Sequence, residues 1–320
     1  MNASVVHSLN SPPRYEVFAD PVPAEGEVLV QVTAAGLHPI VKALANGTHY
    51  GSTGEFPLIP GIDGTGRLPD GSAVYFGLSR PPFGTFAERS LTLRKRCLAL
   101  PDGLDPVTAA ALANPGMSSW VALKFRAGFA AGESVLILGA TGVAGQLAVQ
   151  ISKRLAARRV IAAGRNPKAL AVLSELGADQ IVSLDQSQDD VILAFRREFS
   201  ETGIDVVLDY LWGAPAESAL AAIAQKGLQH AASRIRYVQI GNSAGPTLSL
   251  DAATLRSSRL ELSGSGFGSA SIEQIWQALG EFFASAAKQP YRVEIKTAPL
   301  RDVEKLWNEP ERGVRVVFQP

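Results

Sequence analysis

The chain has little cysteine and no excess of either charge. Its only thiol, Cys97, excludes a disulfide within the chain and any zinc site built from several thiolates. Thirty basic residues balance thirty acidic ones, so no global field attracts nucleic acid or an anionic membrane. We therefore expect no nucleic-acid partner, and the cysteine content is compatible with a reducing cytosol.

Long hydrophobic runs are also absent. Gly, Ser or charged residues interrupt every apolar stretch well before the roughly 20 residues that a membrane-spanning helix needs. Residues 1–18 lack the basic segment and apolar run of a signal peptide. A length of 320 residues with 46% hydrophobic and 19% charged residues is typical of a globular protein with two domains. The sequence predicts a cytoplasmic protein with no membrane partner.

Residues 1–110 are rich in proline and glycine and contain several short runs with a β pattern. Turn-forming residues at 69–71 and 81–84 separate them. Around Asp105–Trp120 the composition changes to alanine, which predicts a helical connection to a second lobe. The expected strands are Ser4–His7, Glu27–Thr33, Ser72–Phe76 and Thr85–Leu91.

From Ser134 onwards, strand and helix patterns alternate. The apolar run 134–138 is typical of a parallel strand covered on both faces, and helical spacing follows over 143–156. Asn166-Pro167 and Gly177 are typical of the start and the end of the next helix. Further strands are expected at 159–163, 181–184, 205–209 and 236–240. This alternation predicts an α/β fold with a doubly wound parallel sheet.

The tail predicts a helix from about Ser271, a strand near Tyr291–Lys296, a short helix and a terminal strand at 313–319. The parallel sheet is complete without these elements, so we expect the tail to return to the first lobe. The predicted domains are therefore a β-rich catalytic domain, formed by residues 1–115 and 266–320, and a dinucleotide-binding domain of residues 116–265.

A glycine-rich turn lies between the strand at 134–138 and the helix that follows. Gly139, Gly142 and Gly145 have the spacing G-x-x-G-x-x-G. Such glycines allow a tight turn, close approach of the backbone to a pyrophosphate, and packing of helix against strand. The helix N-terminus presents free N–H groups to the phosphates. The turn predicts dinucleotide binding through residues Gly139, Thr141, Gly142, Val143, Ala144 and Gly145.

The end of the second strand indicates which dinucleotide is bound. NAD-specific sites have an acidic residue there, which holds the ribose 2′-OH. This sequence has Gly164-Arg165-Asn166 and no carboxylate, with Lys168 one turn further along. A guanidinium suits a 2′-phosphate. The predicted cofactor is NADPH, although an exposed arginine is also an ordinary surface residue.

Several motifs occur together in one order along nearly the whole chain. They are PAEGEVLVQVTAAGLHP (23–39), FPLIPGIDGTG (56–66), GTFAERS (84–90), AAALANPGMSSW (109–120), ILGATGVAGQLAVQ (137–150), LGADQIV (176–182), VVLDYLWG (206–213) and YVQIG (237–241). With them the chain resembles the medium-chain dehydrogenase/reductase superfamily, in its zinc-free quinone oxidoreductase branch. The resemblance implies a Rossmann domain and a β-rich, GroES-like catalytic domain, with the active site between them and a homodimeric assembly. The apolar strand within Ser249–Gly264 is the expected edge-to-edge contact of the dimer.

The same resemblance implies that no metal is bound. The positions of the zinc ligands in zinc-dependent members correspond here to His38, Ile62 and Asn114. Isoleucine has no ligand atom, and an amide is a poor zinc ligand. Without a Lewis acid, oxidation of an unactivated alcohol is difficult. Hydride transfer to a quinone or an enone needs only hydrogen bonds to the resulting oxyanion.

The resemblance also implies the site residues outside the glycine turn. His38, Tyr50 and Asn114 are the catalytic candidates, although related proteins often have Asn in place of His38, and His38, Tyr50 and Asn114 can equally be packing residues. His38 is a candidate hydrogen-bond or proton donor. Asp63 is expected to brace its loop. The further cofactor candidates are Ser118, Tyr210, Gly241, Asn242, Gly266 and Phe267.

Three functions remain open from the sequence. The leading one is an NADPH-dependent reductase of a small quinone or α,β-unsaturated carbonyl. An enoyl-thioester reductase and a non-catalytic NADPH-binding protein are the alternatives. The natural acceptor, the proton donor and the oligomeric state are not defined by these motifs.

Overall fold

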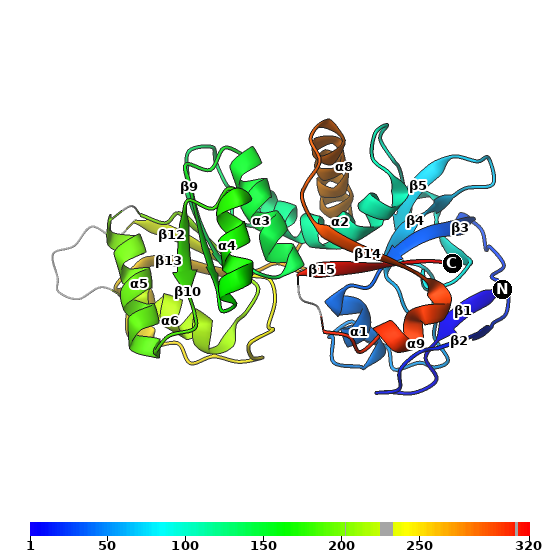
Figure 1. The fold of residues 1–320 in the computed structure, drawn as a ribbon, viewed down its shortest axis with the longest axis horizontal. Helices are drawn as coiled ribbons and strands as arrows, with labels where there is room; N and C mark the ends of the chain where they lie inside the picture. The colour runs from blue at the N-terminus through cyan, green and yellow to red at the C-terminus, as the bar shows by residue number, and fades with distance from the viewer. Residues whose placement is uncertain (202, 225–232, 311–312) are drawn as a thin grey trace. The chain divides into compact units, whose positions relative to one another are not determined.

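The computed structural model of the protein describes residues 1–201, 203–224, 233–310 and 313–320. The described chain divides into two compact units (Figure 1). Unit 1 comprises Met1–Met117 and Trp276–Pro320, and unit 2 comprises Ser118–Ile275.

Unit 1 is built on an extended β-sheet. Among the described residues the strand order is β14-β15-β3-β4-β5-β7, and β6 pairs with β3. A separate hairpin pairs β1 with β2. Strands β14 and β15 come from the tail, and β15 pairs with β3 so that Phe318 lies opposite Ala35. The strands are β1 (Asn2–Val5), β2 (Arg14–Val17), β3 (Glu27–Gly36), β4 (Asp63–Arg67), β5 (Ala73–Gly77), β6 (Arg89–Leu93), β7 (Cys97–Ala99), β14 (Glu294–Pro299) and β15 (Val314–Gln319).

Helices close the core of unit 1. Phe282 of α8 is fully buried, and a Cβ on Gly116 of α2 would collide with the Phe282 ring. The neighbouring Phe283 meets Tyr75 of β5 edge-on, with ring centroids 5.3 Å apart. Glycine at position 116 therefore allows α2 to pack closely on α8. The helices are α1 (Pro39–Ala45), α2 (Pro106–Val121), α8 (Ile272–Lys288) and α9 (Val303–Leu306), with 3₁₀ turns at Arg94–Arg96 and Leu300–Asp302.

Unit 2 has the predicted doubly wound α/β fold. Its described strands form one parallel sheet in the order β10-β9-β8-β11-β12-β13, and every residue of β8 is buried. Figure 1 shows α3 and α4 on one face of the sheet and α5 and α6 on the other. The strands are β8 (Ser134–Leu138), β9 (Arg159–Gly164), β10 (Gln180–Ser183), β11 (Val206–Asp209), β12 (Arg234–Gln239) and β13 (Arg259–Gly264). The helices are α3 (Val143–Arg154), α4 (Pro167–Glu175), α5 (Gln188–Glu201), α6 (Gly213–Ile223) and α7 (Ala252–Arg256), and a π-helix (Ala122–Arg126) follows α2.

Local signals set the bounds of α4 as predicted. The Asn166 side chain accepts hydrogen bonds from Lys168 N and Ala169 N at 3.0 and 3.2 Å, which caps the helix. Gly177 has a φ of +110°, a conformation that favours glycine after a helix. Within the described part of the chain, no helix is both long enough and apolar enough to span a membrane.

The predicted strand Thr85–Leu91 is wrong in its first half, because regular pairing begins only at Arg89. The backbone N–H groups of Thr85 and Phe86 donate to Gly61 and Pro60 at 3.2 and 3.0 Å. Those bonds join the segment to the loop before β4. Phe86 O also accepts from Ser4 N of β1 at 2.8 Å, but Ala87 and Ala3 form only an isolated antiparallel bridge and no regular strand pair. The alternating pattern thus predicted the burial of Thr85 and Phe86 but not the path of their backbone.

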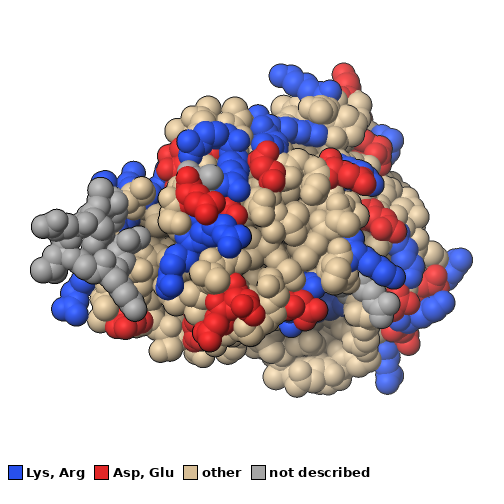
Figure 2. All heavy atoms as spheres, turned by 60° about the vertical axis from the view of Figure 1, so that its left-hand side comes forward, with Lys and Arg blue, Asp and Glu red and all other residues tan. Residues whose placement is uncertain are grey.

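Charged side chains of both signs share the surface. On the face drawn in Figure 2, Lys and Arg are interspersed with Asp and Glu. This mixture agrees with the balanced count of thirty residues of each sign.

Candidate cofactor and acceptor site

The parallel register places the candidate cofactor residues of unit 2 along one edge of the sheet. Ala163, Leu138, Asp209, Gln239 and Gly264 lie side by side on five adjacent strands. The predicted contacts at 139–145, 164–168, 210, 241–242 and 266–267 follow these positions directly. Ligands of open α/β sheets bind at this carboxyl edge, where the strand order reverses. Here the reversal falls between β8 and β11.

The first glycine of the turn has a backbone conformation that other residues rarely adopt. Gly139 has a φ of +84°, and a Cβ there would lie 3.0 Å from Leu211 Cδ2. The N–H groups of Gly139 and Ala140 both donate to Ala163 O, at 3.0 and 2.9 Å. The turn is therefore fixed to the end of β9.

The other two glycines differ in what surrounds them. A Cβ on Gly145 would collide with the backbone of Gly139 and Ala140, so glycine is needed for α3 to pack on the turn. Gly142 is exposed, and the nearest atom to a Cβ there is Gly139 O at 3.7 Å. The backbone at the start of α3 thus faces open space, which suits a diphosphate.

The segment after β9 presents basic side chains beside this turn. Gly164 is buried, and a Cβ there would lie 2.6 Å from Thr141 Cγ2. Arg165 and Lys168 are exposed. The amide oxygen of Asn166 is engaged in capping α4, so this residue has a structural role whether or not it contacts a ligand.

A buried carboxylate holds the loop after β11. Asp209 Oδ1 accepts hydrogen bonds from Leu211 N and Trp212 N at 2.8 and 3.0 Å, and Asp209 Oδ2 accepts one from the Tyr237 hydroxyl at 2.8 Å. Burial raises the pKa of Asp209, although these hydrogen bonds oppose the shift. Trp212 has a φ of +56° and a ψ of −162°, which costs about 1–3 kcal/mol outside glycine. The Asp209 network keeps the loop in this conformation.

Hydroxyl groups meet beside the same loop. The Tyr210 hydroxyl lies 2.7 Å from Ser119 Oγ, and Ser118 also forms a hydrogen bond with it. Burial raises the pKa of Tyr210 to about 12, although both hydrogen bonds lower it. Tyr210 is therefore neutral at pH 7. Of the predicted contacts, Ser118 and Tyr210 are thus brought together.

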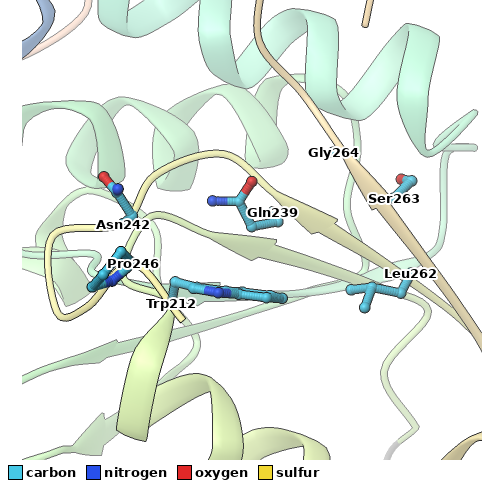
Figure 3. A pocket seen from close by; sticks show the side chains of 7 residues that line it. All are labelled: Trp212, Gln239, Asn242, Pro246, Leu262, Ser263 and Gly264. Atoms are coloured by element: carbon cyan, nitrogen blue, oxygen red, sulfur yellow. The ribbon is translucent and has the colours of Figure 1, made fainter. Parts of the chain in front are cut away.

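An open pocket of 420 Å³ lies next to the ends of β12 and β13. Figure 3 shows the Trp212 indole below the Gln239 side chain, with Leu262 at one end and Asn242 and Pro246 at the other. Gln239 Nε2 donates to Gly241 O at 3.0 Å. Asn242 lines this pocket, whereas Gly266 and Phe267 belong to the next loop.

In unit 1, His38 and Asp63 are both buried, with His38 Nε2 3.4 Å from Asp63 Oδ1. The Tyr75 hydroxyl donates to Asp63 Oδ2 at 3.0 Å, and burial, reinforced by Asp63, raises the pKa of Tyr75 well above its usual value. Neither imidazole nitrogen of His38 has a well-oriented hydrogen bond to a described residue. Asp63 thus links a histidine and a tyrosine.

The other two catalytic candidates of unit 1 differ from His38 in their exposure. Tyr50 is 72% exposed and stacks on His49 at 4.1 Å between ring centroids. Asn114 is half-buried in α2. The described residues contain no group of three or more His, Cys, Asp or Glu side chains arranged to hold a metal ion.

Three side-chain contacts, one in unit 1 and two in unit 2, were not predicted from the sequence. Tyr75 and Tyr237 bind buried aspartates, and Arg126 donates to the loop after β13. The VVLDYLWG motif contains Asp209, but the strand pattern gives no sign of a partner that lies 28 residues away in the sequence. Trp212 is part of the same motif, and no local signal predicts its positive φ.

Comparison with known proteins agrees with this geometry. Residues 143–285 match the family described as zinc-binding dehydrogenase. The chain is 28% identical, over the full length of both, to a probable NADPH-dependent quinone reductase, tdiC, of Emericella nidulans. It is 29% identical to a trans-enoyl reductase, pgmF, of Aspergillus terreus, over 59% of this chain and 58% of that protein.

A solved structure extends the likeness to both units. The quinone oxidoreductase of Thermus thermophilus is 26% identical to this chain, with a TM-score of 0.79 over the whole of both chains. The fold and the glycine turn define a dehydrogenase/reductase with a dinucleotide-binding sheet. These likenesses agree with the predicted resemblance to the medium-chain dehydrogenase/reductase superfamily and its quinone oxidoreductase branch.

Proposed function

We propose that the protein is an NADPH-dependent oxidoreductase that transfers hydride to a quinone or an α,β-unsaturated carbonyl without zinc. The observation that carries this proposal is the turn from Gly139 to Gly145. The space beside the backbone is open at Gly142, whereas at Gly145 the backbone of the turn itself fills it. The names of the E. nidulans and T. thermophilus relatives support NADPH-dependent reduction of a quinone.

The residues of the turn suit a diphosphate better than any side-chain site would. Backbone N–H groups at the start of α3 would bind the phosphates, because the helix dipole and the unpaired first-turn donors favour an anion. Arg165, with Lys168, would bind the 2′-phosphate. When bound, NADPH supplies the hydride. The cofactor contacts at Ser118, Tyr210, Gly241, Asn242, Gly266 and Phe267 remain predictions.

The acceptor would be held by the chain's own hydrogen-bond donors. Ile62 cannot bind a cation, and Asn114 is a poor zinc ligand. His38, Tyr50 and Asn114 remain the proposed residues for orienting the acceptor or protonating its oxygen. We assign them to a catalytic domain of residues 1–115 and 266–320, and we assign residues 116–265 to a cofactor domain.

Steady-state turnover tests the proposal. We expect the chain to oxidise NADPH in the presence of a simple quinone or a small enone. The loss of absorbance of the reduced nicotinamide measures this reaction. The name of the A. terreus relative favours one second candidate, an enoyl-thioester reductase. An enoyl thioester assayed in parallel distinguishes the two. NADPH binding without turnover on any of these acceptors would instead indicate a non-catalytic NADPH-binding protein.

Cofactor preference gives a sharper test at a single side chain. Arg165→Ala should raise the KM for NADPH about tenfold or more and leave the KM for NADH within about twofold, because only NADPH has the 2′-phosphate. Kinetics with both cofactors checks this. Equal effects on NADPH and NADH would contradict the role of Arg165.

We also propose a homodimer that forms through β13. This strand pairs only with β12 among the described residues, so its other edge is free, and Leu262 is 40% exposed. A free strand edge with apolar side chains can pair with a second copy. Light scattering on the purified chain tests this assembly. A cytoplasmic location remains a prediction, which fractionation of the source cells would check.

A further inference from the structure

Arg126 joins the two ends of the glycine-rich loop 264–270. Its Nε donates to Gly264 O at 2.7 Å, and its Nη1 donates to Ser269 O at 2.9 Å. A planar guanidinium can hold two carbonyl groups at once in a fixed geometry. Arg126 is half-buried at the end of the π-helix, and single π-turns are frequent at functional sites.

Loop 264–270 lies at the surface of unit 2. None of its residues is buried, and Gly268 has a φ of +94°. Its base is attached to the sheet by Ser265 N, which donates to Gln239 O at 2.8 Å. Inside the loop, Ser269 Oγ accepts from Gly266 N at 2.7 Å. Hydrogen bonds therefore contribute to the order of this segment.

The two bonds from Arg126 differ in kind from the others. They come from a residue 138 and 143 positions away in the sequence, whereas those of Ser269 are local. They also involve a charged donor, and such hydrogen bonds are about twice as strong as neutral ones. Removing Arg126 would remove both of these long-range bonds from the two ends of the loop.

We propose that Arg126 is a positioning residue for cofactor binding, which holds loop 264–270 in the conformation that presents Gly266 and Phe267 to the nicotinamide half of NADPH. This inference rests on the proposed function. Arg126 acts through the backbone of the loop, because it donates hydrogen bonds to Gly264 and Ser269. It therefore increases the fraction of molecules in which the loop has the conformation that binds NADPH. Apparent affinity falls in proportion to the fraction of molecules in that state.

The test compares Arg126→Ala and Arg126→Lys with Arg234→Ala as a matched control. Arg234 also makes two side-chain bonds within unit 2, to Glu261 at 2.7 and 2.8 Å, and joins β12 to β13 at their amino ends. The charge change is the same, but loop 264–270 is not involved. Hydrogen exchange of residues 264–270 is measured without cofactor. The dissociation constant for NADPH, the KM for NADPH and kcat are then measured for each variant.

We expect faster exchange in the loop of Arg126→Ala, and a dissociation constant and KM for NADPH about tenfold higher. The kcat at saturating NADPH should remain within about twofold, since bound cofactor restores the competent state. Lysine keeps the positive charge but lacks the planar, fixed fork of a guanidinium, so Arg126→Lys should lie between the wild type and Arg126→Ala. Arg234→Ala should match the wild type in every measurement.

Two results would overturn the inference while the proposed function stands: unchanged loop exchange in both Arg126 variants, or faster exchange with unchanged NADPH affinity. Should Arg126→Ala fail to fold, Arg126→Lys decides by the same criteria. A wild-type chain that binds no NADPH would overturn the proposed function and this inference together.

Discussion

Each unit contains a tyrosine that donates to a buried aspartate, and the two aspartates differ in what else they bind. Asp209 in unit 2 accepts three hydrogen bonds, two of them from the backbone of the next loop. Asp63 in unit 1 accepts one from Tyr75, and its other oxygen faces His38 at 3.4 Å. The first arrangement fixes a loop, whereas the second leaves an imidazole with hydrogen-bonding capacity. This difference distinguishes a structural carboxylate from one beside a candidate catalytic group.

The largest effect is expected at Asp209. Asp209→Ala would leave Leu211 N, Trp212 N and the Tyr237 hydroxyl unpaired, and should lower the free energy of unfolding by about 3–5 kcal/mol. Asp63→Ala removes one well-formed hydrogen bond and should cost about 1–3 kcal/mol. Urea unfolding of both variants checks the order. A larger loss at Asp63 would reverse the comparison.

The two tyrosines predict a loss of stability at alkaline pH. Burial raises the pKa of both Tyr75 and Tyr237 in the folded state. Their contribution to the free energy of unfolding is therefore complete below about pH 10, which is the pKa of tyrosine in the unfolded chain. It is lost as the pH rises through the higher pKa of these tyrosines in the folded chain. Unfolding measured on either side of about pH 10 should show this fall. The double variant Tyr75→Phe/Tyr237→Phe should lose less free energy of unfolding over this pH range, with Tyr210 still contributing. An equal loss in the wild type and the double variant would contradict the assignment of the alkaline effect to Tyr75 and Tyr237.

A smaller stability effect is expected at His38, where function and stability should separate. His38 has no well-oriented hydrogen bond to a described residue, so His38→Leu should change the free energy of unfolding by no more than about 1 kcal/mol. Turnover should fall about a hundredfold if His38 protonates or orients the acceptor. Urea unfolding and steady-state kinetics on one preparation give both values. Full activity in a stable variant would make His38 a packing residue.

Local patterns predicted the elements of unit 2 because each signal is complete within a few residues. The run 134–138, the cap at Asn166 and the positive φ of Gly177 need no distant partner. Parallel pairing then follows from the alternation of strands and helices. The candidate cofactor residues consequently fall at one edge of the sheet.

What the sequence did not predict depends on contacts between distant segments. The bonds from Tyr237 to Asp209, from Tyr75 to Asp63 and from Arg126 to Gly264 join residues whose spacing has no period. Asp63 was expected to brace its loop, but neither the hydroxyl of Tyr75 nor the proximity of His38 can be inferred from the motif. The path of Thr85 and Phe86 was missed for the same reason.

Gly142 and Gly145 extend the comparison to the cofactor turn. Gly145→Ala should destabilise the fold, because its Cβ would collide with the backbone of Gly139 and Ala140. At Gly142 the nearest atom would be 3.7 Å away, so Gly142→Ala should fold with nearly wild-type stability. A Cβ there would occupy the space proposed for the diphosphate.

Calorimetric titration of NADPH into the wild type and into Gly142→Ala tests the central claim most directly. We predict one site per chain in the wild type and binding at least about tenfold weaker in the folded variant, since a methyl group would hold the phosphates away from the backbone donors. No heat of binding for either NADPH or NADH in the wild type, or equal affinity in the two proteins, would contradict the claim that the main chain of this turn binds the cofactor.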